Sequence, residues 1–185
     1  MNKSKIARRL SSIPGFKKHG SFYVGLCNDD VLSGYCLDTT PRASYVWRFI
    51  LPSFDRIEYL HLALGERILT VECDAELADL GNEVLRDWQR FSVVCNRGLL
   101  VDHLAEIGGG GLYGTWVRYL VHIRNQNFSA AGQLLATLAP DQQLTNLPLI
   151  AESFRQISQE RDTSGWHACV ALLESWSSET RSVYC

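Results

Sequence analysis

The sequence lacks the patterns that mark several common classes of protein. No apolar run approaches the roughly 18 residues of a membrane-spanning helix, and the first residues lack the continuous apolar stretch of a secretory signal. There is no C-x-x-C pair, no H-E-x-x-H helix, no G-x-S-x-G elbow and no G-x-x-x-x-G-K-[ST] loop. We therefore expect no membrane span, no metal and no cofactor, and nothing in the sequence supports a hydrolase.

Acidic residues are missing from the first 28 positions, which carry six basic ones. The rest of the chain has 12 basic and 20 acidic residues, so its body is acidic although the net charge is only −2. Such a body disfavours a nucleic-acid binder and attracts a basic partner. The basic N-terminus has two open interpretations: an organelle targeting segment, or a structural helix with Ile6, Leu10 and Ile13 on its apolar stripe, ended by Pro14 and Gly15.

Six cysteines are scattered through the chain: Cys27, Cys36, Cys73, Cys95, Cys169 and Cys185. An even number is compatible with disulfides, but a domain of this length folds without such cross-links. Because no secretory signal is present, we expect reduced and mostly buried thiols and a cytoplasmic protein.

Between residues 21 and 72 the apolar residues recur with a period close to two, which is typical of strands. The clearest case is SYVWRFIL, where Tyr45 and Trp47 share one face and Val46 and Arg48 the other. SFYVGLCN and VLSGYCLD flank a turn at 28–30, and TTPRA separates the second run from the third. Successive antiparallel pairing is the expected topology.

The segment DRIEYLHLALGERILTVE allows two predictions. Asp55 and Glu58 would form a capping box for a short helix that ends at Gly65. Alternatively, residues 59–64 and 67–72 are strands joined by a type II′ turn that begins at Gly65. The alternation of leucines in the first half favours the hairpin.

Beyond residue 73 the apolar pattern becomes helical. DAELADLGNEVLRDWQRF begins with Asp74 as the predicted N-cap. Further helices are predicted at 97–107, 113–125, 129–139, 148–160 and 164–178.

The predicted fold class is α+β, with a division near residue 72. Residues 1–72 form a short N-terminal helix and an antiparallel sheet of about four to five strands. Residues 73–185 form an all-helical region of about five to six helices, packed on the sheet as one structural unit.

Two short stretches resemble known families. IPGFKKHGSFYVGL resembles the opening of a family of small bacterial proteins of unknown function, through Gly15, Phe16, Lys17, Lys18, Gly20, Phe22 and Tyr23. This likeness covers at most the first 70 residues and implies an α+β sheet domain without an established enzymatic activity. WVRYLVHIRNQNFSAAGQLLATLAP is similar to a single tetratricopeptide helix pair at Asn127, Phe128 and Ala131.

The glycine run near the middle of the chain matches a dinucleotide-binding pattern at Gly109, Gly111 and Gly114. That fingerprint requires a preceding strand and an acid about 20 residues further on. The preceding GLLVDHLAEI has a helical pattern, and the first acid after Gly114 is Asp141. We therefore expect a helix-to-helix connection, with Gly108 just past the first helix.

The favoured function is non-enzymatic. We expect a bacterial protein-binding module, of which an immunity-like protein that neutralises a basic toxin by direct binding is the concrete case. The predicted partner surface consists of Asp74, Glu76, Asp79, Glu83 and Trp166. The four acids also have a structural explanation, because a helix N-terminus favours negative charge. A homo-oligomer is left open.

The alternative is an enzyme of unknown class with a site assembled from dispersed residues. Asp102 and His103 are adjacent on one helix and would meet His61 in a cleft between sheet and helices. A pocket with two or more convergent titratable groups would favour this alternative.

Overall fold

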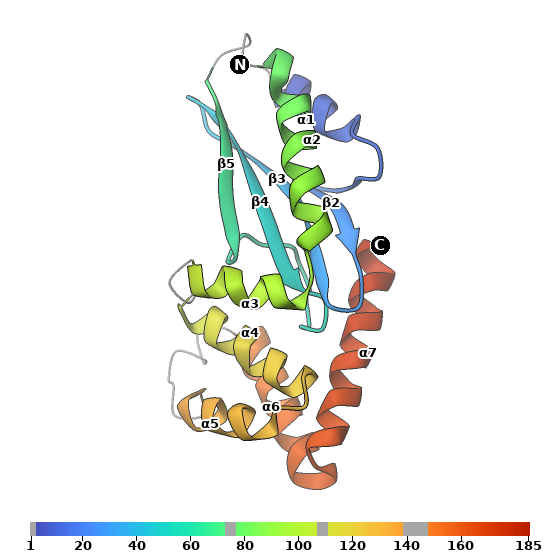
Figure 1. The fold of residues 1–185 in the computed structure, drawn as a ribbon, viewed down its shortest axis with the longest axis vertical. Helices are drawn as coiled ribbons and strands as arrows, with labels where there is room; N and C mark the ends of the chain where they lie inside the picture. The colour runs from blue at the N-terminus through green and yellow to red at the C-terminus, as the bar shows by residue number, and fades with distance from the viewer. Residues whose placement is uncertain (1–2, 73–76, 107–110, 139–147) are drawn as a thin grey trace.

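The computed structural model describes residues 3–72, 77–106, 111–138 and 148–185. It begins with α1 (Lys3–Ser11) and five strands: β1 (Lys17–His19), β2 (Phe22–Cys27), β3 (Val31–Thr39), β4 (Ser44–Pro52) and β5 (Gly65–Val71). The described helices that follow are α2 (Leu77–Val94), α3 (Arg97–Glu106), α4 (Gly111–Arg124), α5 (Phe128–Leu138), α6 (Pro148–Ser164) and α7 (Trp166–Tyr184). This arrangement confirms the predicted α+β fold class (Figure 1).

The strands form one antiparallel sheet in chain order. In the β3–β4 ladder Tyr35 lies opposite Arg48, and Leu37 lies opposite Val46. Asn28 closes the predicted turn between β2 and β3. Its side-chain oxygen accepts hydrogen bonds from the backbone N–H groups of Asp30 and Val31, at 2.9 and 2.8 Å.

One face of the sheet is covered by α1 and α2 (Figure 1). Ile6 and Leu10 of α1 are buried and belong to one cluster with Val84 of α2 and with Tyr35 and Val46 of the sheet. The apolar stripe predicted for the first helix is therefore buried. The predicted N-cap of the following helix, Asp74, lies outside the described residues.

The opposite face is covered by the end of α7 and by the loop that connects β4 to β5, residues 53–64, which we call the pocket loop. Phe49 and Leu51 of β4 cluster there with Tyr184 of α7 and with Leu60 and Leu62 of the pocket loop. The loop is thus packed against the sheet rather than extended into solvent.

The hairpin predicted for the pocket loop is wrong in its first half. Residues 59–64 form neither a strand nor the alternative helix, and β5 begins at Gly65 and pairs with β4. Leu60 and Leu62 pack under the sheet, whereas Leu64 is buried in the helical core. The leucines at every second position therefore anchor a loop in two apolar clusters, and their spacing is the same as that of a strand.

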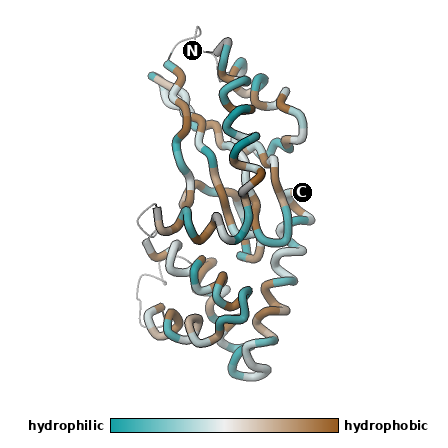
Figure 2. The backbone as a smooth tube through the Cα atoms, viewed as in Figure 1, coloured by the Kyte–Doolittle hydropathy of each residue, from teal (hydrophilic) through white to brown (hydrophobic). Residues whose placement is uncertain are grey.

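The helices α3 to α6 gather beyond one end of the sheet, and α7 runs from this helical end back to the side of β2 (Figure 1). Their largest cluster includes Trp116 and Leu120 of α4 and Leu173 of α7, together with Phe54 and Leu64 of the pocket loop. Hydrophobic and hydrophilic positions are both visible along the strands and along α2 (Figure 2). No described helix is both long and apolar enough to cross a membrane.

Candidate functional site

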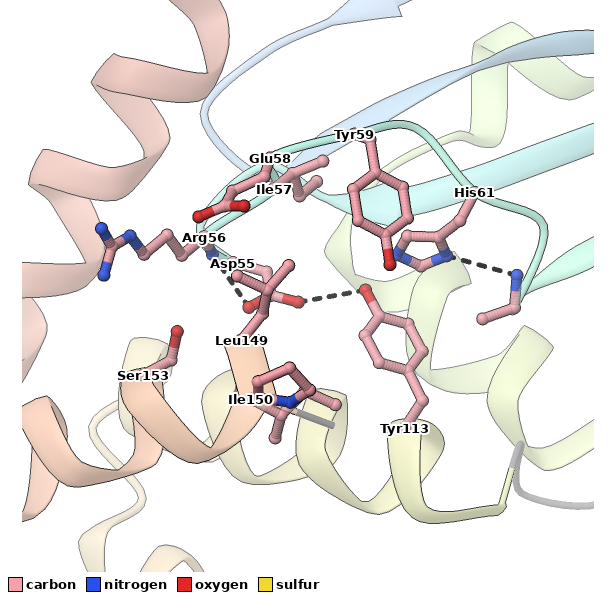
Figure 3. A pocket seen from close by; sticks show the side chains of 12 residues that line it. Asp55, Arg56, Ile57, Glu58, Tyr59, His61, Tyr113, Leu149, Ile150 and Ser153 are labelled. Atoms are coloured by element: carbon pink, nitrogen blue, oxygen red, sulfur yellow. Dashed lines mark hydrogen bonds between the residues drawn. The ribbon is translucent and has the colours of Figure 1, made fainter. Parts of the chain in front are cut away.

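A pocket of about 520 Å³ lies between the pocket loop, α4 and the start of α6 (Figure 3). Its walls are mainly apolar or aromatic, and they include Ile57, Tyr59, Tyr113, Leu149 and Ile150. Small-molecule sites have volumes of roughly 300–1,000 Å³ and are lined in the same way, with a few polar groups among apolar side chains.

The carboxyl group of Asp55 is the most deeply buried charge-bearing group of the pocket. The residue is 6% exposed. One carboxyl oxygen accepts hydrogen bonds from the indole N–H of Trp116 and from the backbone N–H of Arg56, at 3.1 and 2.9 Å. The other accepts the hydroxyl of Tyr113 at 3.1 Å. Because Tyr113 and Trp116 are three residues apart, α4 presents both donors on one face.

Burial dominates the electrostatics of this group. Desolvation raises the pKa of Asp55, and the hydrogen bonds from Trp116, Tyr113 and the backbone of Arg56 oppose that rise. Desolvation also raises the pKa of Tyr113 well above its usual value, so this residue remains a neutral phenol that donates to Asp55.

Three aromatic side chains, of Tyr59, His61 and Tyr113, line the same pocket as Asp55. The ring of His61 meets that of Tyr113 edge-on, with centroids 4.9 Å apart, and that of Tyr59 with centroids 6.2 Å apart. Nδ1 of His61 accepts the backbone N–H of Ala63 at 3.3 Å, so the neutral ring carries its proton on Nε2. Burial lowers the pKa of His61, which favours this neutral form near pH 7.

Hydrogen bonds from α7 hold the pocket loop. The hydroxyl of Thr180 donates to the backbone oxygen of Asp55 at 3.3 Å, and the hydroxyl of Tyr184 donates to that of Glu58 at 3.2 Å. The C-terminal end of α7 therefore helps to hold the pocket loop in place.

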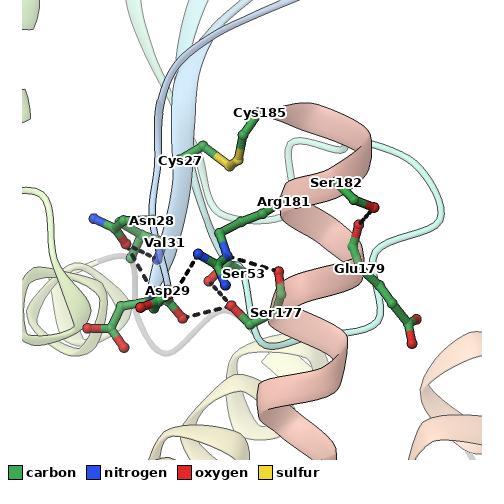
Figure 4. The surroundings of a disulfide bond; sticks show 11 residues. Cys27, Asn28, Asp29, Val31, Ser53, Ser177, Glu179, Arg181, Ser182 and Cys185 are labelled. Carbon is green, nitrogen blue, oxygen red and sulfur yellow. Dashed lines mark hydrogen bonds and ion pairs between the residues drawn. A yellow bond between two sulfur atoms is a disulfide. The ribbon is translucent and has the colours of Figure 1, made fainter.

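That end of α7 is joined to β2 by a disulfide between Cys27 and Cys185 (Figure 4). The prediction of reduced cysteines is wrong for this pair, because the fold brings together two side chains that are 158 residues apart in sequence. Cys95 and Cys169 are buried thiols, as predicted, and desolvation raises the pKa of each to about 11. Disulfides are typical of oxidising compartments, whereas the sequence predicted the cytoplasm from its lack of a secretory signal, so that location stays a prediction.

Polar contacts surround the disulfide. Arg181 lies 2.6 Å from a carboxylate oxygen of Asp29, whose backbone oxygen accepts the hydroxyl of Ser177 at 3.0 Å (Figure 4). The hydroxyl groups of Ser177 and Ser53 are 3.2 Å apart and buried. The covalent bond thus closes an interface that already joins α7 to the β2–β3 turn and to the start of the pocket loop.

The structure separates the three residues predicted for an enzyme site. His61 lines the pocket. Nε2 of His103 instead lies 3.3 Å from the backbone oxygen of Leu64, where it supports the end of the pocket loop. Asp102 is exposed on α3.

The acids of the predicted partner surface are described only in part. Asp79 and Glu83 are exposed on α2, one helical turn apart. Asp74 and Glu76 lie outside the described residues.

The aromatic member of that predicted surface lies elsewhere. Trp166 is the first residue of α7, which begins at the end of the molecule opposite α2 (Figure 1). Its ring stacks on Phe128 with centroids 5.7 Å apart, and the guanidinium of Arg161 lies 5.7 Å from its centroid. The described residues therefore do not bring Trp166 together with Asp79 and Glu83.

The glycine run connects two helices, as the sequence predicted. α3 precedes it and α4 begins at Gly111, so the strand that a dinucleotide fingerprint requires is replaced by a helix. Gly114 is buried within α4, and residues 107–110, which include Gly108, lie outside the described part.

Sequence reasoning missed Asp55 and Tyr113 as members of a site. The only local signals are an acid directly after the apolar end of β4 and the spacing of Tyr113 and Trp116, which place two aromatic donors on one helix face. Neither signal reveals that the two segments meet.

Within the described ranges, no group of three or more His, Cys, Asp or Glu residues is placed to hold a metal ion. Comparisons with family models, with curated proteins and with solved structures find no match to this chain.

Proposed function

We propose that this chain binds a small organic molecule in the pocket between the pocket loop, α4 and α6. The observation that carries the proposal is the convergence of three titratable side chains, Asp55, His61 and Tyr113, on a largely apolar cavity of about 520 Å³. Such convergence on a largely apolar cavity is typical of small-molecule sites. It gives this function more support than the exposed acids on α2 give to a protein partner.

The hydrogen-bonding state of the pocket favours binding over proton-transfer chemistry. His61 accepts the Ala63 N–H at Nδ1 and therefore offers Nε2–H as a donor to a ligand. Tyr113 already donates to Asp55, so its oxygen is left as an acceptor. A histidine that acts as a general base would instead need an unprotonated nitrogen that faces the ligand.

A pocket-filling substitution tests the proposal. Ala63 lines the pocket and is exposed, so Ala63→Trp occupies the cavity without removing a buried side chain. We expect fragments that bind the native protein in saturation-transfer NMR to lose their signal with Ala63→Trp. The matched control is Ala171→Trp, at an exposed position on α7, which should bind like the native protein. Fragments that bind the Ala63→Trp variant equally well, or the absence of any binding fragment, would contradict the proposal.

A protein partner, with a basic toxin as the concrete case, is the second candidate. The observation in its favour is that Asp79 and Glu83 are exposed and face the same side of α2. Charge reversal of both residues to lysine should weaken a purified basic partner's binding by on the order of tenfold or more. The control reverses two exposed acids elsewhere, Asp38 and Asp102. If both variants lost the same affinity for the partner, net charge alone would explain the effect, and a specific binding surface on α2 would be contradicted.

A further inference from the structure

The carboxylate of Asp55 has no countercharge in the described structure. Its three hydrogen-bond donors are a phenol, an indole and a backbone N–H. Every ion pair among the described residues joins other side chains. Arg56 also lines the pocket, but its side chain extends away from Asp55, toward α7 (Figure 3). A buried carboxylate is costly without a cation, and its raised pKa has the same cause.

The hydrogen bonds that the described residues make to this carboxyl group leave one of its acceptor positions unused. One oxygen accepts two hydrogen bonds, whereas the oxygen that faces Tyr113 accepts one. An ionised carboxylate accepts about four hydrogen bonds. A cationic head group beside Tyr113 would therefore lie against the carboxylate oxygen whose charge is less compensated by hydrogen bonds.

The neighbouring side chains suit a cation. His61 and Tyr113 are almost perpendicular, at 85°, and Tyr59 stands at 70° to His61, so the three rings form a corner with differently oriented faces. Ring faces attract ammonium groups, and this attraction grows when water is excluded. His61 does not repel a cation, because its lowered pKa keeps the ring neutral near pH 7. Glu58 adds a second, exposed carboxylate to the lining.

The remaining walls suit an apolar body attached to that head group. Ile57 of the pocket loop and Leu149 and Ile150 of α6 line the cavity together with the three rings. A purely inorganic cation would leave these side chains without a contact, whereas an organic ammonium compound uses both parts of the pocket.

We propose that the pocket selects organic cations, with an ammonium group held between the carboxylate of Asp55 and the rings of Tyr59, His61 and Tyr113 and an apolar body against Ile57 and α6. This inference rests on the proposed function, because it names the ligand class of the same pocket.

The test compares two probes of the same shape that differ in charge, 3-hydroxyphenyltrimethylammonium and 3-tert-butylphenol, by isothermal titration calorimetry on the native protein. We expect the ammonium probe to bind on the order of tenfold more tightly or better. Asp55→Asn keeps the shape and removes the charge, so it should reduce this preference. Glu58→Gln, at an exposed position, provides a second variant whose folding is not in question, and it should reduce the preference to a smaller extent.

The outcomes separate the two proposals. If the phenol binds as tightly as the ammonium probe, and Ala63→Trp abolishes both, the cation inference is overturned and the proposed function stands. If neither probe binds while other fragments remain sensitive to Ala63→Trp, the cation inference is again overturned alone. If no compound is sensitive to Ala63→Trp, both proposals are overturned.

Discussion

Replacing Cys27 and Cys185 by serine is expected to lower the melting temperature by roughly 5–15 °C. The disulfide joins residues 158 positions apart, so it constrains almost the whole unfolded chain. The chain-entropy model gives about 5 kcal/mol for a loop of this length, and measured values are typically about 2–4 kcal/mol. Differential scanning calorimetry under oxidising conditions, on the native protein and the double variant, provides the comparison.

A dithiol reductant provides the control for this prediction. The native protein should fall to the melting temperature of the double serine variant when reductant is added, whereas the variant should not respond. Thiol titration of the unfolded native protein should find two more thiols after reduction than before. An identical melting temperature for native protein and variant without reductant would contradict the cross-link.

Replacing Asp55 by alanine is expected to cost on the order of 3–5 kcal/mol. The substitution leaves the indole N–H of Trp116 and the hydroxyl of Tyr113 without their acceptor, and Trp116 is fully buried. Each unsatisfied buried donor costs about 1–3 kcal/mol. Asp55→Asn retains one oxygen acceptor and should cost less. Urea denaturation of the three proteins measures the difference.

The pH dependence gives this prediction a second readout. Because the pKa of Asp55 is raised on folding, the folded state binds the proton more tightly than the unfolded state. Its contribution to the free energy of unfolding is therefore largest at low pH and is lost as pH rises through the folded-state pKa. The free energy of unfolding of the native protein, relative to that of Asp55→Asn, should therefore decrease as the pH rises.

An exposed acid provides the matched control. Asp38→Ala removes a carboxylate from an exposed position on β3 and should change the stability by less than about 0.5 kcal/mol at every pH. If Asp55→Ala were equally harmless, Asp55 would not be the acceptor that anchors α4 to the pocket loop.

The spacing of apolar residues was sufficient to predict the helices and strands that bury one face. The strand β4 alternates as expected, because its two faces meet different apolar clusters, one under α1 and α2 and the other under α7. Ile6 and Leu10 likewise predict α1 and are buried, whereas Ile13 of the predicted stripe is buried but follows the end of α1 at Ser11. In these elements the local pattern and the tertiary packing require the same residues.

The parts that sequence missed depend on contacts between distant segments. Asp55 meets Tyr113 and Trp116 about 60 positions further along the chain, and no local pattern encodes that meeting. The pocket loop was taken for a strand because its leucines occupy every second position, although Leu60 and Leu62 pack in one cluster and Leu64 in another. The Cys27–Cys185 pairing follows from the path of α7, which periodicity does not give.

Intermolecular NOEs between the methyl protons of 3-hydroxyphenyltrimethylammonium and the protein test the central claim most directly. We predict cross-peaks to the ring protons of Tyr59, His61 and Tyr113, because these side chains line the pocket together. Cross-peaks confined to residues outside the pocket lining, or no cross-peaks at a concentration that saturates calorimetric binding, would contradict the assignment of this pocket as the ligand site.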